Sequence, residues 1–167
     1  MKMGLTIATD ADLPEVVALV NLAYRGGDHG GWTREDYIGG TRTTVAELRA
    51  DIAAKPDARL ILLREDGVLL GTVWIEPAGE GAWYLGLLTV QPDLQAGGIG
   101  RRLLEGAEDM ARSLGGGRMR MTVVHIRDTL IAWYHRRGYV LTGETLPFPH
   151  GDPPRDDLSF VVLEKAL

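Results

Sequence analysis

Residues 84–115 read YLGLLTVQPDLQAGGIGRRLLEGAEDMARSLG, and this stretch decides the fold. It begins with an apolar run, residues 85–90, whose length and Val/Thr content are typical of a buried strand. Three glycines follow the strand closely. After them, apolar residues recur at steps of three and four, at Ile99, Leu103, Ala107, Met110 and Leu114. The pattern predicts a strand, a glycine loop and an amphipathic helix.

The glycine loop stands at the start of the predicted helix, where a backbone can bind an anion. Gly97, Gly98 and Gly100 lack a Cβ, so a ligand can approach, and the first helical N–H groups point outward at the positive end of the dipole. Arg101 and Arg102 occupy that first turn, where cations oppose the dipole unless a negative ligand meets them. From the loop alone, a phosphate site and a tight turn with solvated arginines are equally good interpretations.

The composition is that of a soluble globular protein. Its 167 residues are most simply one domain, residues 1–167, large enough to bury a core. A formal net charge of −5 gives no support to a nucleic-acid partner, which favours a basic face. The absence of cysteine excludes disulfides and thiol catalysis and makes the cytoplasm the default location. No stretch approaches the ~20 apolar residues of a membrane span, so no membrane partner is expected.

The chain before residue 84 predicts two helices and a run of strands. A short strand is expected at residues 5–8, then a helix that ends near Tyr24 and a second helix over residues 44–54. The glycine-rich segment between the helices, residues 25–42, has weak periodicity and predicts a loop, with at most a short helical turn at residues 33–38.

A hairpin and a further turn lead into the central stretch. Residues 59–64 and 68–76 flank Glu65-Asp66-Gly67, so a hairpin is predicted with its turn at Asp-Gly. Pro77, Gly79 and Gly81 are expected to form the next turn. The strand at residues 85–90 then completes an antiparallel meander of three strands.

The chain after the central helix predicts the second half of the sheet. Gly115 begins a triple-glycine helix stop, and residues 118–124 suit a strand that a right-handed crossover places parallel to residues 85–90. A short helix at residues 129–137 and strands at residues 139–142 and 158–163 follow, with a proline-rich connection at residues 147–154. The predicted fold class is α+β, a mixed, mostly antiparallel sheet of about seven strands with about four helices.

Two motifs resemble the GNAT superfamily of N-acetyltransferases. Gln95-Ala96-Gly97-Gly98-Ile99-Gly100 fits the Gln/Arg-x-x-Gly-x-Gly/Ala signature of that family, placed after a strand that ends at Val90 and is followed by Pro92. Residues 133–139, WYHRRGY, are similar to the apolar-Tyr-x-x-x-Gly-Phe/Tyr helix end of the family. The element order matches as well, so the resemblance covers nearly all of the chain. It implies a GNAT-type sheet whose central parallel strand pair is splayed.

The resemblance implies acetyl-coenzyme A as the co-substrate. Backbone N–H groups from Gln95 through Arg101 would hold its pyrophosphate. Leu88 and Val90 would pair with the pantetheine arm, the N–H near Leu88 would polarise the thioester carbonyl, and Gly86 would permit a bulge. The cofactor-binding residues so implied are Leu88, Thr89, Val90, Gln95, Ala96, Gly97, Gly98, Ile99, Gly100, Arg101 and Arg102.

The resemblance also assigns a general acid and leaves the base open. Tyr134 matches the family's acid, which protonates the leaving thiolate, although a tyrosine at a helix end can also simply anchor its ring in the core. Many members carry a Glu on the strand before the glycine loop, and Tyr84 stands there instead. Glu76 is the nearest carboxylate, so the base is Glu76, Tyr84 with a water, or neither. Arg127 stands where many members have an Asn near the cofactor's arm, so a side-chain contact there is not carried over.

The four histidines are scattered, with no HxH or HExxH spacing, so no metal site is expected. His29 and His150 lie in the two long loops that would frame the acceptor, beside Trp32 and Phe148. A polar and aromatic rim suits a small molecule, although single loop histidines are commonly surface residues.

The sequence therefore predicts an acetyl-CoA-dependent N-acetyltransferase that acts on a primary amine of a small molecule, by direct attack in a ternary complex. One alternative is acetylation of a protein N-terminus or lysine. An alternative of another class is a non-catalytic acyl-CoA sensor or interaction domain. A homodimer is compatible with the sequence, which fixes neither the oligomeric state nor the acceptor.

Overall fold

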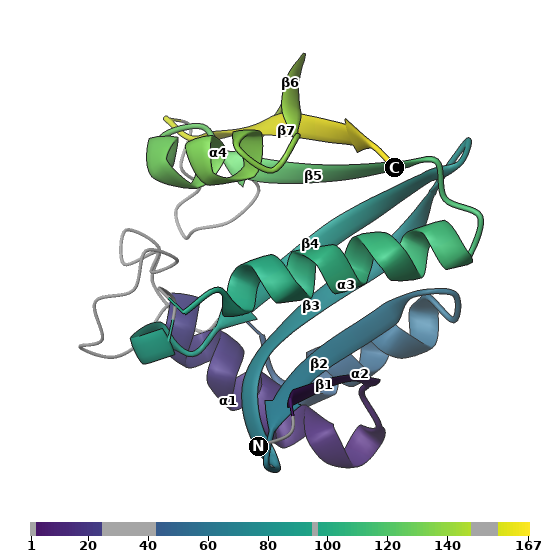
Figure 1. Ribbon diagram of the computed structural model, residues 1–167, viewed down its shortest axis with the longest axis vertical. Helices are drawn as coiled ribbons and strands as arrows, with labels where there is room; N and C mark the ends of the chain where they lie inside the picture. Colours follow the sequence, from purple (N-terminus) through teal and green to yellow (C-terminus); the bar gives the residue numbers. More distant parts are fainter. Residues whose placement is uncertain (1–2, 25–42, 95–96, 148–156) are drawn as a thin grey trace.

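The structure is a computed structural model that describes residues 3–24, 43–94, 97–147 and 157–167. Figure 1 shows a sheet with helices on both faces, the α+β fold predicted from the sequence. The elements in chain order are β1 (Met3–Ile7), η1 (Asp10–Asp12), α1 (Leu13–Tyr24), α2 (Val45–Ala54), β2 (Arg59–Glu65), β3 (Val68–Gly79), β4 (Ala82–Val90), η2 (Pro92–Leu94), α3 (Ile99–Ser113), β5 (Arg118–Val124), α4 (Asp128–His135), β6 (Val140–Pro147) and β7 (Ser159–Ala166). Within the described residues, no helix is long and apolar enough to cross a membrane.

The sheet has seven strands in the order β1-β2-β3-β4-β5-β7-β6. Neighbouring strands are antiparallel except for β4 and β5, which are joined through α3 and pair in parallel. The predicted mixed sheet, its meander and its one parallel crossover are therefore confirmed. In Figure 1 the two halves of the sheet meet at one end of β4 and β5 and separate toward the other.

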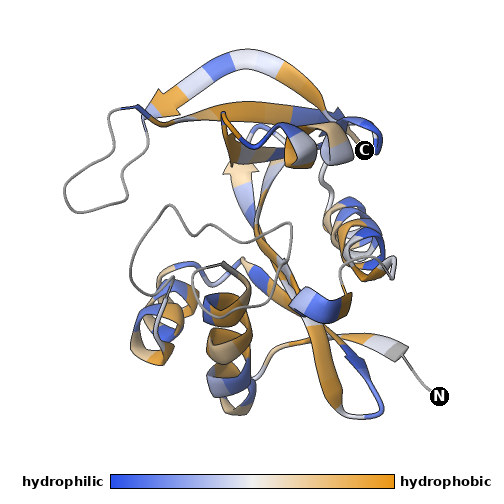
Figure 2. Ribbon diagram, turned by 90° about the vertical axis from the view of Figure 1, so that its left-hand side faces the viewer, coloured by the Kyte–Doolittle hydropathy of each residue, from blue (hydrophilic) through white to orange (hydrophobic). Residues whose placement is uncertain are grey.

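Alternating side chains on β2 divide the core into two layers. Leu60 and Leu62 face α1 and α2, whereas Ile61 and Leu63 belong to the core beneath α3. This is the period-2 alternation expected of a strand that is covered on both faces. Figure 2 shows the two layers, with α1 and α2 on one side of strands β1–β4 and α3 on the other.

Several predicted strand boundaries were wrong. β4 begins at Ala82 and not at residue 85, and β7 continues past residue 163 to Ala166. Pro77 lies within β3, opposite Trp83 of β4, and the turn is confined to the residues between Gly79 and Ala82. A proline fits there because β2 pairs with β3 only as far as Ile75, which leaves the other edge of β3 without a ladder. β6 is also longer than predicted and runs from Val140 to Pro147. The prediction stopped short because all residues of this strand are exposed, so they show no alternation of buried and exposed positions.

Asp12 fixes the entry to α1, and its loss should cost measurable stability. Its carboxylate accepts a hydrogen bond from the Thr9 N–H at 2.8 Å and pairs with Arg64 at 2.9 Å. The Thr9 bond, followed by Arg64, holds the pKa of Asp12 below its usual value. A carboxyl whose pKa is lowered by folding stabilises the folded state fully above its unfolded pKa of about 3.9. The contribution is therefore present at neutral pH and is lost as the pH falls through the lowered pKa.

We expect Asp12→Ala to lower the free energy of unfolding by about 1 kcal/mol at pH 7, the usual worth of such a cap. Urea unfolding at pH 7 and pH 3 measures this. The difference from the native chain should shrink at the lower pH. Asp109→Ala is the control, because Asp109 forms only an exposed pair with Arg112. Equal losses for the two variants at pH 7 would contradict the role assigned to Asp12.

Candidate active site

The parallel strands β4 and β5 are paired along only part of their length. The pairing covers Ala82, Trp83 and Tyr84 against Arg118, Met119 and Arg120. Beyond it, β4 continues to Val90, and β5 stays paired with β7 along its whole length. Beyond the pairing the two strands diverge, as Figure 1 shows. The predicted splay is thus present, and Leu88, Thr89 and Val90 lie on its β4 side.

A bulge on β4 marks the start of the divergence. Thr72 of β3 pairs with Thr89 and Trp74 pairs with Gly86, so one residue of β3 faces both Leu87 and Leu88. Leu87 has a φ of +56°, a conformation that costs a non-glycine residue roughly 1–2 kcal/mol. The bulge turns the end of β4 away from the regular ladder and sets the direction of the Leu88 backbone.

Gly86 makes room for an aromatic ring. A Cβ at this position would lie 3.2 Å from Cε1 of Tyr84, because the ring lies along the strand over Gly86. The sequence suggested that Gly86 permits the bulge, but the residue in the left-handed conformation is Leu87. Gly86 instead allows the position of Tyr84, whose hydroxyl is 3.2 Å from the Thr122 hydroxyl of β5.

The glycine loop leads into α3 through a left-handed N-cap. Gly98 has a φ of +79° and contributes no capping side chain. The Gly97 N–H donates to the Leu94 carbonyl at 3.0 Å and the Arg102 N–H donates to Gly98 at 3.1 Å, so both are committed to the protein's own backbone. Helix geometry leaves the N–H groups between them, from Ile99 to Arg101, without intrahelical acceptors. These three groups are the candidate anion-binding part of the loop.

The first turn of α3 lies between β4 and α4. A Cβ at Gly100 would be 3.5 Å from the Trp133 ring and 3.7 Å from Val90. Ile99 and Gly100 are buried, whereas Arg101 and Arg102 are exposed. The loop therefore opens at the wide end of the splay, with the two arginines at its rim.

Tyr134 is buried beside this opening. It is 5% exposed and packs edge-on against Trp133 and Tyr139, with ring centroids 5.1 Å and 5.7 Å apart. Behind it, the Tyr139 hydroxyl donates to Glu108 at 2.8 Å, and Lys165 binds the same carboxylate at 3.1 Å. Burial and the Glu108 charge raise the pKa of Tyr139 far above its usual value, so Tyr139 is a structural donor. These contacts join α3, the end of α4 and β7 around Tyr134.

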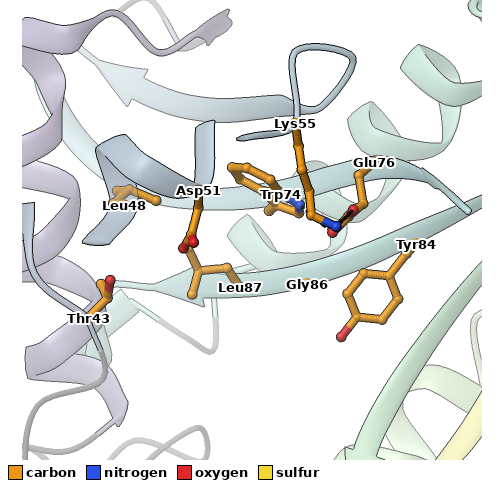
Figure 3. A pocket seen from close by; sticks show the side chains of 9 residues that line it. All are labelled: Thr43, Leu48, Asp51, Lys55, Trp74, Glu76, Tyr84, Gly86 and Leu87. Carbon is orange, nitrogen blue, oxygen red and sulfur yellow. Dashed lines mark hydrogen bonds and ion pairs between the residues drawn. The ribbon is translucent and has the colours of Figure 1, made fainter. Parts of the chain in front are cut away.

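A pocket of about 300 Å³ lies on the opposite face of β3 and β4 from α3. It is shown in Figure 3 and is lined by Thr43, Leu48, Asp51, Lys55, Trp74, Glu76, Tyr84, Gly86 and Leu87. Glu76 and Tyr84 are directly opposite each other in the β3–β4 register, so their side chains share this face. The two residues proposed from the sequence as alternative bases are therefore neighbours in one pocket.

The Glu76 carboxylate is bound at both oxygens. Lys55 Nζ donates to Oε2 at 2.6 Å and Trp74 Nε1 donates to Oε1 at 3.1 Å. The bond to Glu76 raises the pKa of Lys55, which keeps the ammonium protonated at neutral pH. Figure 3 shows Lys55 extending from the end of α2 across the pocket to Glu76.

Other predicted positions have mixed outcomes. Arg127 is the N-cap of α4. Gln95, Ala96, His29, Trp32, Phe148 and His150 lie outside the described residues. Within the described part of the chain there is no group of three or more potential metal ligands. The sequence analysis missed Asp51 and Lys55, because only the packing of α2 on the sheet brings them to this pocket. It also missed Trp74, which lies two residues before Glu76 on β3.

A family model matches the part of the chain that builds this site. The model describes the Acetyltransferase (GNAT) family and matches residues 28–139, well over half of the chain. The chain belongs to the GNAT acetyltransferase family. This GNAT chain is 37% identical over 103 residues to the IAA acetyltransferase of Azospirillum brasilense, a match that covers 60% of this chain and 65% of that protein. The matches span between 26% and 65% of the length of the curated relatives.

Solved GNAT structures share the fold along almost the whole chain. The ribosomal-protein-alanine N-acetyltransferase from Brucella melitensis has a TM-score of 0.75 at 20% identity, covering 98% of this chain and 99% of that one. The phosphinothricin acetyltransferase from Sinorhizobium meliloti, solved in complex with AcCoA, has a TM-score of 0.75 at 17% identity, covering 100% and 89%. At these identities the similarity establishes the GNAT fold.

Proposed function

We propose that this protein is an acetyl-CoA-dependent N-acetyltransferase that acts on a primary amine of a small molecule. The observation that carries the proposal is the convergence of three features at the wide end of the splay. These are the bulged end of β4, the uncapped first turn of α3, and the buried Tyr134. Family membership and a structural relative solved with AcCoA support the same reading.

The residues at the splay fit the coenzyme. The N–H groups of Ile99, Gly100 and Arg101 would bind its pyrophosphate, and Arg101 and Arg102 would add positive charge at the rim. The Leu88 and Val90 backbone would line the pantetheine arm. The bulge at Leu87 sets the direction of the Leu88 backbone, whose N–H would polarise the thioester carbonyl. The coenzyme supplies an acetyl thioester whose carbonyl carbon accepts the amine.

Tyr134 is the general acid of the proposal. A thiol has a pKa of about 8.5 and a phenol about 10, so a positioned tyrosine can protonate the leaving thiolate at neutral pH. Its ring is fixed by Trp133 and Tyr139 from two directions, which holds the hydroxyl in one place. The proton leaves the tyrosine oxygen as the C–S bond breaks.

Glu76 is the proposed proton acceptor for the incoming ammonium. An alkyl ammonium of pKa about 10.4 must lose a proton before it attacks, and Glu76 is the partly buried carboxylate of the pocket. Lys55 and Trp74 each donate a hydrogen bond to one of its oxygens. The proton of the ammonium therefore reaches Glu76 through a water, or directly after Lys55 has been displaced. Tyr84, opposite Glu76, orients that water.

We expect Glu76→Gln to lower kcat/KM about ten- to a hundredfold, at the modest end of what general bases contribute, because water can replace an indirect base in part. Tyr84→Phe should have a smaller effect. Glu80→Gln, in the exposed turn of the same hairpin, is the matched control and should leave kcat/KM unchanged. Steady-state kinetics with one amine measures all three. Activity of Glu76→Gln equal to that of the control would remove Glu76 from the mechanism.

The pocket volume favours a small acceptor. About 300 Å³ is at the lower end of the range for small-molecule sites. Thiol release from acetyl-CoA with a panel of small amines, lysine peptides and N-terminal peptides tests the proposal, and the cysteine-free chain contributes no thiol of its own. Amine-dependent release with small amines is the expected result. Thiol release with peptides alone would indicate that the protein acetylates other proteins. Binding of acetyl-CoA without thiol release would indicate a coenzyme sensor.

A further inference from the structure

Arg137 is held in an unusual position just after α4. Its Nη1 donates to the Trp133 carbonyl at 2.8 Å, and the guanidinium carbon lies 4.0 Å from the centroid of the Trp133 ring. Its Nε is buried and has no hydrogen-bond partner within the described residues. A surface arginine usually keeps its guanidinium hydrated. Arg137 is instead held by the Trp133 carbonyl and ring, and its Nε–H makes no hydrogen bond within the described residues.

The Trp133 ring connects Arg137 to the first turn of α3. The same ring packs against Gly100, which begins the anion-binding turn. Arg101 in that turn and the adjacent Arg136 are close enough to act on Arg137. Together with burial, which has the larger effect, they lower its pKa. Trp133 thus places Arg137 beside the first turn of α3, among like charges.

The described residues supply little negative charge to compensate this group. Glu105 is the acid that acts on Arg137, and it already lies 3.6 Å from Arg101 in an exposed pair. Like charges at such sites repel one another, at a cost that grows as they leave water. An anion bound between α3 and α4 would offset this repulsion.

We propose that Arg137, fixed on the Trp133 ring, binds a phosphate group of the coenzyme at the N-terminal end of α3. The inference rests on the proposed acetyl-CoA function. Coenzyme A carries a pyrophosphate and a 3′-phosphate, more negative charge than three N–H groups can satisfy. A guanidinium that is already oriented can offer its remaining Nη donors at little entropic cost. Arg137 is therefore a binding residue, in addition to capping the α4 carbonyl.

Calorimetric titration tests the inference without relying on catalysis. Coenzyme A and 3′-dephospho-coenzyme A are titrated into the native protein, Arg137→Gln and Arg137→Lys. Arg112→Gln, at the far end of α3, is the control. A lost charged hydrogen bond to phosphate corresponds to about a ten- to hundredfold weaker Kd for coenzyme A. Arg137→Lys should lose less, and Arg112→Gln should match the native protein.

The two ligands identify the phosphate. A loss seen with coenzyme A and absent with 3′-dephospho-coenzyme A assigns Arg137 to the 3′-phosphate. An equal loss with both, together with a shallower salt dependence of Kd, assigns it to the pyrophosphate. A purely structural role would leave the salt dependence of Kd unchanged. Thermal melting of each variant identifies any that fails to fold, in which case Arg137→Lys carries the test.

A Kd for Arg137→Gln within twofold of the native value for coenzyme A would overturn the inference and leave Arg137 as a helix cap only. If Arg137→Gln does not fold, an Arg137→Lys variant with the native Kd and the native salt dependence overturns it equally. Failure of the proposed function looks different, because the native protein itself would then bind neither ligand.

Discussion

Gly98→Glu is expected to abolish measurable acetyl-CoA binding. The new carboxylate would stand at the N-cap of α3, where the N–H groups of Ile99, Gly100 and Arg101 converge. There it would occupy the phosphate position and repel the pyrophosphate. We expect affinity to fall by at least about a thousandfold, since both the donors and the charge complementarity are lost. Isothermal titration calorimetry with acetyl-CoA measures this directly.

Gly115→Glu is a closely matched control for this variant. Gly115 follows α3 at its other end and has a φ of +90°, compared with +79° for Gly98, and neither glycine has a heavy atom within 4 Å of the added Cβ. Both variants therefore pay a similar backbone strain of roughly 1–2 kcal/mol. Gly115→Glu should bind acetyl-CoA normally. An unchanged Kd for Gly98→Glu, or an equal loss in both variants, would contradict the phosphate site at the start of α3.

Tyr134→Phe is expected to lower kcat by about a hundred- to ten-thousandfold, the usual contribution of a positioned general acid. Acetyl-CoA affinity should change little, because the variant keeps the ring between Trp133 and Tyr139 and removes only the oxygen. Thiol release measures kcat, and calorimetry measures binding. The thermal midpoint should stay near that of the native protein.

Two outcomes for Tyr134→Phe have different meanings. Native turnover would show that the hydroxyl is not the acid. A loss of turnover accompanied by a similar loss of acetyl-CoA affinity would assign Tyr134 to coenzyme binding instead. Thiol release should be measured with several amine acceptors. With a poor acceptor, a step other than acetyl transfer could limit the rate, and an effect on the chemical step would not be seen.

Local sequence determined the glycine loop and α3. The steps of three and four from Ile99 onward, the glycines before them and the glycines after Leu114 depend on backbone and burial preferences that act over a few residues. The same reasoning correctly placed the parallel crossover, because a strand, a helix and a strand in succession leave few other arrangements.

The pocket could be predicted only in part. Glu76 and Tyr84 were identified one by one, but their pairing depends on a strand register set by the Gly79–Ala82 turn and by the irregularity between Pro77 and Gly79. A leucine gives no sequence signal for a left-handed conformation, since glycine or asparagine is the residue that usually adopts it. Lys55 reaches Glu76 only because α2 packs against this face of the sheet.

The contacts of Arg137 also could not be predicted from the sequence. The sequence places it inside the Tyr-x-x-x-Gly helix end, where it is one of two adjacent arginines with no distinguishing neighbour. Its stacking on Trp133, and the contact of that ring with Gly100, are tertiary contacts between α4 and α3. Spacing in the sequence alone could not indicate that Trp133 connects Arg137 to the first turn of α3.

Hydrogen–deuterium exchange with and without acetyl-CoA tests directly whether the coenzyme occupies the splay between β4 and β5. Upon saturation with acetyl-CoA, we expect slower exchange in peptides that cover residues 87–90 and 98–102, with little change in β1 and β2. Acetyl-CoA binding that is measurable by calorimetry yet leaves exchange in those two segments unchanged would contradict a coenzyme site in the splay.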